Sequence, residues 1–175
     1  ELLDLAWRRF SAQPSNRDLL EAFAGERPWV RDYSLFVAIK QSLGNLPWYE
    51  WPLELRQRQQ DAVQSVGTLL ADEISRHIFT QFLFFNQWRR LRAYAQAQEV
   101  KIIGDLPIFV ALDSADVWAH QAIFQLDASR SQPTHVAGVP PDYFSATGQR
   151  WGNPLYCWET EDANVRNQLW DWWEQ

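Results

Sequence analysis

Residues 100–105 of the sequence read Val100-Lys101-Ile102-Ile103-Gly104-Asp105, a short apolar run that ends in a carboxylate. The run follows a long tract of helical character, and this helix-to-strand alternation is typical of an α/β fold. Pro107 lacks the N–H that a central strand donates, so the strand is expected to end near Asp105. Ligands of α/β barrels and open α/β sheets lie at this carboxyl end of the strands. Asp105 is therefore a candidate site residue.

The sequence upstream of this run has the spacing of helices. One helix is expected through Ala24, capped by Asn16 and Asp18 and closed by Gly25, and another over 29–43 with Gly44 as its left-handed stop. Residues 53–98 predict two or three further helices, with Gly67 as a possible break. An apolar stripe along this tract, expected to pack on a core, contains Ile74, Ile78, Phe82, Phe85, Trp88, Leu91, Tyr94 and Ala95.

Downstream, residues 113–158 show almost no regular spacing, and a last helix is expected over 159–175 with Trp170 and Trp173 on its buried side. A long irregular stretch inside a compact domain is usually functional or mobile. Within it, the double proline before Asp142 fixes the backbone and presents that carboxylate beside Tyr143 and Phe144. Such a group suits a sugar, which offers hydroxyls to an acid and apolar faces to rings. A structural loop whose rings plug into the core fits the same residues.

Composition narrows the class of protein. With 46% hydrophobic and 22% charged residues, the chain can bury a core. Its charge is 16 − 22 = −6 without a basic run, which argues against a nucleic-acid partner. No apolar stretch is long enough to cross a membrane. The single Cys157 excludes an internal disulfide, and the three histidines lack metal-ligand spacing, so neither a metal nor a cofactor is expected.

The chain is rich in aromatic residues, with 11 Trp, 10 Phe and 5 Tyr. Most are expected in the core, because burying a ring is strongly stabilising. Glycosyl chemistry needs two carboxyl groups, and the sequence does not pair any two of its candidates. These candidates are Asp105, Asp113, Asp116 and Asp142.

Four ordered blocks carry a family resemblance: IGDLPIFVA (103–111), DSADVW (113–118), AGVPPDYFSATGQ (137–149) and WGNPLY (151–156). Together they resemble the amylomaltase family, the 4-α-glucanotransferases or disproportionating enzymes. The resemblance implies an α/β fold, a (β/α)8 barrel with helical insertions, of which residues 1–175 are one incomplete portion. In this interpretation residues 1–99 are mainly a helical insertion, 100–158 hold an early barrel strand and the substrate loop, and 159–175 form a helix.

The resemblance also implies the activity. The family moves α-1,4-glucan segments to glucose or glucan acceptors with retention, through an aspartate nucleophile, a glutamate acid/base and a covalent glycosyl-enzyme. The nucleophile belongs to an Arg-x-Asp-His-like motif that residues 1–175 do not contain. No catalytic residue is therefore assigned, and the isolated chain is expected to be inactive and prone to aggregate, since a partial barrel leaves an unpaired edge.

Seven positions are expected to bind substrate by resemblance: Asp142, Tyr143 and Phe144 of a flexible loop over the cleft, Gln149, Trp151 and Asn153 of its far arm, and Asp105. The expected partners are α-1,4-glucan oligosaccharides and glucose, without nucleic acid or membrane. The expected location is the cytoplasm, or the plastid in a plant. A non-catalytic α-glucan-binding module on the same half-barrel, and a hydrolase of the same superfamily, are alternatives. Departures from the family pattern fall in turns, at Glu99 and at 129–131.

Overall fold

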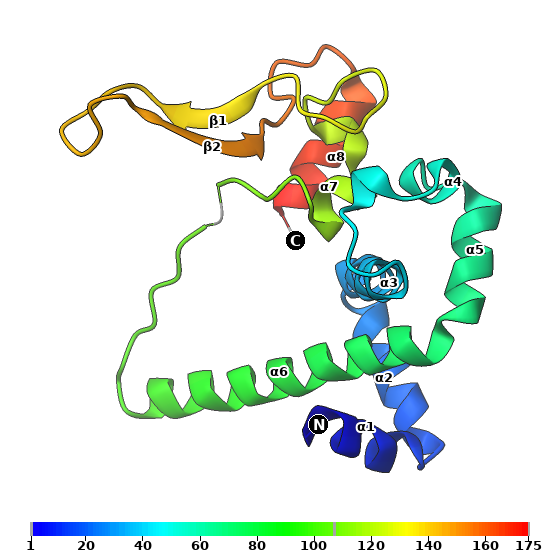
Figure 1. Ribbon diagram of the computed structural model, residues 1–175. Coiled ribbons are helices and arrows are strands. Elements are labelled where there is room, and N and C mark those ends of the chain that lie inside the picture. Colours follow the sequence, from blue (N-terminus) through cyan, green and yellow to red (C-terminus); the bar gives the residue numbers. More distant parts are fainter. Residues whose placement is uncertain (1, 107, 175) are drawn as a thin grey trace. The chain divides into compact units, whose positions relative to one another are not determined.

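The computed structural model describes residues 2–106 and 108–174. The described chain is mostly helical, with one two-stranded sheet (Figure 1). It divides into two compact units, which are described separately: unit one is Glu1–Asn45 with Gln60–Leu106, and unit two is Leu46–Gln59 with Pro107–Gln175.

Unit one is a helical layer built on the longest helix, α6. Its helices are α1 (Leu2–Ser11), α2 (Ser15–Gly25), α3 (Pro28–Ser42), α5 (Gln60–Leu69) and α6 (Ala71–Ala97). Helices α1, α2 and α3 all contact α6. Aromatic rings fill the interface, with the centroids of Phe10 and Phe79 at 4.7 Å and those of Trp7 and Phe79 at 5.6 Å. These contacts, together with buried Val30 and Ile78, form the core of the unit.

The helix boundaries correct two predictions. Asn16 and Asp18 do not cap α2, because the helix already begins at Ser15, and the Asn16 amide donates instead to the Phe10 carbonyl oxygen at 2.8 Å. Gly67 lies inside α5, and the helical conformation is instead interrupted at Leu70, between α5 and α6. The left-handed stop after α3 is confirmed, since Gly44 has φ of 70°.

The apolar stripe of α6 is buried only in its first half. Ile78 and Phe79 are buried, whereas Leu91 and Tyr94 are exposed, so the prediction of one continuous buried stripe is wrong. Figure 1 shows the reason: the C-terminal half of α6 extends beyond the other helices of unit one. Helical spacing in a sequence indicates which side chains share one face of a helix. It does not indicate how much of that face other helices cover.

Residues 100–105 do not form the predicted strand. Helix α6 ends at Ala97, Glu99 then adopts the left-handed region at φ of 59°, and residues 100–105 have no regular secondary structure. Ile103 is 94% exposed. A strand exists through hydrogen bonds to a neighbouring strand, and none of the described residues supplies that neighbour. The predicted effect of Pro107 on this strand lies outside the described residues.

Unit two packs short helices and a hairpin around tryptophans. Its elements are η1 (Trp48–Glu50), α4 (Leu53–Arg56), α7 (Ala115–Ala119), η2 (Gln121–Ile123), β1 (Val136–Val139), β2 (Gln149–Pro154) and α8 (Ala163–Trp173). Trp48 and Trp118 are fully buried. The indole of Trp48 donates to the Leu112 carbonyl oxygen at 2.6 Å, and that of Trp118 donates to the Leu55 carbonyl oxygen at 2.9 Å. These bonds fasten residues 46–59 to the rest of the unit.

The last helix is shorter than predicted, and of the two tryptophans expected on its buried side, Trp173 is partly buried against Tyr156 and Trp158. Helix α8 begins after Asp162, whose carboxylate accepts from the Asn164 N–H at 2.8 Å. Leu169 is its buried residue, and Trp170 is 54% exposed, so the prediction that Trp170 is buried is wrong. The indole of Trp172 instead reaches the Asp116 carboxylate at 3.2 Å.

Partial burial of His77 on α6 is expected to give unit one a pH-dependent stability. Burial lowers the pKa of His77, and the Arg76 guanidinium lowers this pKa further, although Glu73 opposes the shift. The unfolded chain binds the proton more readily, so the free energy of unfolding should fall as the pH drops below about 6.5, the ordinary histidine pKa. We expect H77Q to show a flatter dependence of Tm on pH between about pH 7 and pH 5.

The control for this prediction is H135Q, which alters an exposed histidine of unit two. The Tm of H135Q should depend on pH in the same way as the Tm of the parent protein. A parent-like pH dependence in H77Q would show that His77 does not contribute.

Candidate functional site

Six of the seven predicted site residues lie in one β-hairpin of unit two. Strands β1 and β2 are antiparallel, with Gly138 opposite Arg150 and Val139 opposite Gln149, and the 140–148 loop joins them. A Cβ at Gly138 would collide with the Gln149 carbonyl oxygen, so the pairing needs glycine there. The prediction that this stretch is irregular is therefore wrong for β1 and β2.

The tip of the hairpin is held by its own hydrogen bonds. Oδ1 of Asp142 accepts from the backbone N–H of Phe144 at 2.9 Å and of Ser145 at 2.7 Å. The hydroxyl of Ser145 donates to the Gly148 carbonyl oxygen at 2.7 Å, which closes the loop from its other side. Asp142 thus shapes the turn through one carboxylate oxygen, in the manner of an Asx-turn.

The rings at the tip point into solvent. Tyr143 is 99% exposed and Phe144 is 90% exposed, and their centroids lie 5.9 Å apart in an edge-to-face arrangement. The alternative in which these two rings plug into the core is therefore wrong. Exposed rings on a rigid turn form an apolar surface that a ligand can cover without much further ordering.

The far arm of the hairpin carries a third ring, with neighbours that hold it. The Trp151 indole N–H donates to Oε1 of Gln149 at 3.1 Å. Its ring meets Phe109 edge-to-face, with centroids 5.9 Å apart. Nδ2 of Asn153 donates to the Val110 carbonyl oxygen at 2.8 Å. Sequence reasoning missed Phe109, although it lies in the first of the four family-like blocks.

Asp105 belongs to unit one, whereas the hairpin belongs to unit two. Asp105 is exposed, and its Oδ1 accepts from the backbone N–H of the next residue, Leu106, at 2.8 Å. The other candidate acids have structural partners, since Asp113 accepts from the Trp48 N–H and Asp116 from the Trp172 indole. No catalytic pair of carboxylates emerges among the described residues.

The described part of the chain gives no support for a metal site, a membrane-spanning helix or a reactive thiol. Residues 2–106 and 108–174 contain no cluster of His, Cys, Asp and Glu able to hold a metal ion. Among the same residues, no helix is both long and apolar enough to cross a membrane. Burial raises the pKa of the Cys157 thiol, which disfavours the reactive thiolate.

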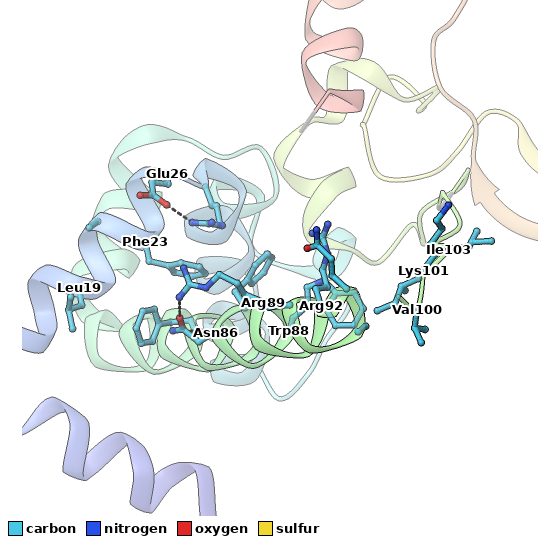
Figure 2. Close-up of a pocket in the computed structure, with 18 of the residues that line it drawn as sticks. Leu19, Phe23, Glu26, Asn86, Trp88, Arg89, Arg92, Val100, Lys101 and Ile103 are labelled. Carbon is cyan, nitrogen blue, oxygen red and sulfur yellow. Dashed lines mark hydrogen bonds and ion pairs between the residues drawn. The ribbon is translucent and has the colours of Figure 1, made fainter. Parts of the chain in front are cut away.

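Unit one has a hollow of its own, of about 1240 Å³, between α2, α6 and the segment after α6. Figure 2 shows Phe23, Trp88 and Arg92 on its wall. The guanidinium of Arg27 lies 4.8 Å from the centre of the Phe23 ring, and Arg27 also pairs with Glu26 at 2.8 Å. No predicted site residue lines this hollow.

The hairpin, with its exposed rings and flanking amides, has the polar and apolar mixture of a ligand-binding loop. The family model described as 4-alpha-glucanotransferase, glycoside hydrolase family 77, matches residues 1–175. The chain therefore belongs to the 4-alpha-glucanotransferase family, as the four sequence blocks predict.

Individual relatives agree. A 4-alpha-glucanotransferase of Thermus thermophilus is 54% identical over 157 residues, covering 88% of this chain and 31% of the relative. One of Aquifex aeolicus is 44% identical over 174 residues, covering 99% of this chain and 34% of the relative. The solved amylomaltase of Streptococcus agalactiae in complex with acarbose matches with a TM-score of 0.88 and 37% identity, over 98% of this chain and 34% of that one. The chain thus spans about a third of the length of these relatives.

Proposed function

We propose that this chain is a portion of a 4-α-glucanotransferase that moves α-1,4-glucan segments to glucose or glucan acceptors, and that the 140–148 loop covers the bound glucan. The whole protein forms a (β/α)8 barrel, in which residues 1–99 are mainly a helical insertion, 100–158 hold the substrate loop and a segment that becomes an early strand once a neighbouring barrel strand pairs with it, and 159–175 form a helix. Family membership over residues 1–175 supports this proposal.

The observation that carries the role of the loop is the exposure of Tyr143 and Phe144 on a turn that Asp142 holds. Apolar ring faces stack on the CH faces of sugars. A lid of this kind excludes water from the reacting bond, so that a second sugar resolves the glycosyl-enzyme instead of water. The lid therefore favours transfer over hydrolysis.

This chain supplies substrate contacts and no catalytic carboxylate. Tyr143, Phe144 and Trp151 stack on glucose rings, while the polar groups of Asp142, Gln149, Asn153 and Asp105 face its hydroxyls. The reaction proceeds with retention, through an aspartate nucleophile and a glutamate acid/base of the whole protein. It needs neither cofactor nor metal, and it takes place in the cytoplasm, or in the plastid of a plant.

The test is the double substitution Y143A/F144A in the full-length protein, incubated with maltotriose. Transfer gives glucose and longer oligomers, whereas hydrolysis gives only shorter sugars. We expect the transfer-to-hydrolysis ratio to fall about tenfold, equivalent to about 1.4 kcal/mol, because both rings leave the lid. The matched control is Y94A/F84A, which removes two exposed rings of α6. An unchanged ratio and acceptor affinity in Y143A/F144A would refute the role of the loop.

A non-catalytic α-glucan-binding module is the second candidate, because the same exposed rings suit binding alone. The intact mass of the native protein separates the two. A native product near 20.6 kDa, the mass of this chain, would favour the module, whereas a product about three times larger that disproportionates maltotriose would favour the transferase.

A further inference from the structure

We propose that Phe109 and Asn153 are positioning residues that fix the indole of Trp151 for stacking on a sugar. The inference rests on the proposed function of the hairpin and extends it to a residue, Phe109, that has no role there. Asn153 acquires a second role in this proposal, because Nδ2 of its amide also holds the hairpin to the Val110 carbonyl oxygen.

The hydrogen bond of the Trp151 side chain limits what it can offer a ligand. Its indole N–H is already engaged by Oε1 of Gln149 at 3.1 Å, and the side chain is 46% exposed. The part left for a sugar is therefore the ring itself. A ring contributes to stacking only when its plane is held in the correct orientation, because a misplaced group loses much of its effect on a bound substrate.

Two neighbouring side chains hold the plane of the Trp151 indole. The Phe109 ring meets the indole at 61° with centroids 5.9 Å apart, the edge-to-face geometry that aromatic pairs favour. With Gln149 on the N–H and Phe109 against the ring, the indole is restrained from two sides. Leucine at position 109 would keep apolar bulk but lose the aromatic contact.

Phe109 lies in a segment of residues 108–113, here called the strap, which is anchored at both ends. A two-stranded hairpin is marginally stable by itself. The strap is fastened to it where Nδ2 of Asn153 donates to the Val110 carbonyl oxygen at 2.8 Å. Its other end is fastened to the fully buried Trp48, whose indole and backbone N–H donate to Leu112 and Asp113 at 2.6 and 3.2 Å. The strap thus links the core of unit two to the exposed indole.

The experiment is a double-mutant cycle in the full-length protein with maltotriose as substrate. We expect F109L to raise KM about threefold to tenfold, the size of an aromatic pair, with kcat within about twofold. F109W should restore KM, because it returns a ring to the site. F109L should have no further effect on KM in a W151A background, because the residue acts through Trp151.

N153D provides a second, independent variant. A carboxylate only accepts hydrogen bonds, so the substituted side chain could not donate to the Val110 carbonyl oxygen, and KM should rise as in F109L. The 19F resonance of Trp151 in fluorotryptophan-labelled protein, assigned by its loss in W151A, should shift in both F109L and N153D. The matched control F84L changes an exposed phenylalanine of α6 and should leave both KM and this resonance unchanged.

The outcomes separate this inference from the proposed function. If W151A raises KM but F109L and N153D do not, the positioning role is refuted and the sugar contact stands. If W151A itself leaves KM unchanged, the sugar contact of Trp151 is refuted, and the positioning role with it. If F109L raises KM equally with and without Trp151, Phe109 does not act through the indole.

Discussion

Replacing Gly148 with alanine is expected to lower the transferase activity of the full-length protein about a hundredfold, the loss that a shift of about 1 Å in a positioned group can cause. Gly148 has φ of 74°, and an added Cβ would lie 2.6 Å from the Val139 carbonyl oxygen and 2.9 Å from the Pro140 carbonyl carbon. Both neighbours are backbone atoms, so the collision cannot be relieved by turning a side chain.

Pro140 and Pro141 restrict how the 140–148 loop can adjust to a shift at Gly148. Pro140 and Pro141 fix their own φ angles, so a shift at Gly148 has to pass into the turn made by Asp142. The rings of Tyr143 and Phe144 would then leave their present positions. Initial rates of maltotriose disproportionation, with Tm as a check on folding, measure this effect.

Two other glycines serve as controls for G148A. Gly152 has φ of 82° with open space around it, so G152A introduces backbone strain without a collision and should have a smaller effect. Gly67 lies within α5, also in open space, and G67A should stabilise the helix by up to about 1 kcal/mol without changing the rate. Activity of G148A equal to that of G67A would contradict the prediction.

The sequence predicts those features of the fold that depend on neighbouring residues. Gly44 ends α3 as expected because its left-handed conformation is a local requirement. The helices over 53–98 are present for the same reason, although their break lies at Leu70. Features that depend on contacts with residues far away in the sequence are harder to predict from the sequence. Whether Leu91 or Trp170 is buried depends on which elements cover α6 and α8, and spacing along the chain does not contain this information.

The candidate site shows the same division. The rigidity of the turn before Tyr143 follows from Pro140 and Pro141, so the sequence alone predicts exposed, ordered rings as one of two alternatives. That Tyr143 and Phe144 are exposed is known only from the structure. The part played by Phe109 requires knowing that the strap lies against Trp151, a contact between residues 42 positions apart that no local pattern encodes.

Replacing Trp118 with alanine is expected to lower the free energy of unfolding by about 3–5 kcal/mol, the range for removing a buried aromatic side chain. Trp118 is fully buried, and its ring meets Trp51 edge-to-face at 5.5 Å. The guanidinium of Arg58 lies over the Trp118 ring, 4.2 Å from its centre. Loss of the indole would leave a cavity and would also remove one donor, at 2.9 Å, from the Leu55 carbonyl oxygen, which keeps the backbone N–H of Arg58 at 3.1 Å.

This substitution should loosen unit two as a whole, because Trp118 fastens α4 and its neighbouring residues to α7. The measurement is urea denaturation of the full-length protein followed by circular dichroism at about 222 nm, which reports mainly the helical backbone. W170A is the matched control, since Trp170 is 54% exposed and should cost less than about 1 kcal/mol. W118F should fall between the two, because phenylalanine refills part of the space but donates no hydrogen bond to Leu55. Equal denaturation midpoints for W118A and W170A would mean that the position of Trp118 in the core carries little of the stability of unit two.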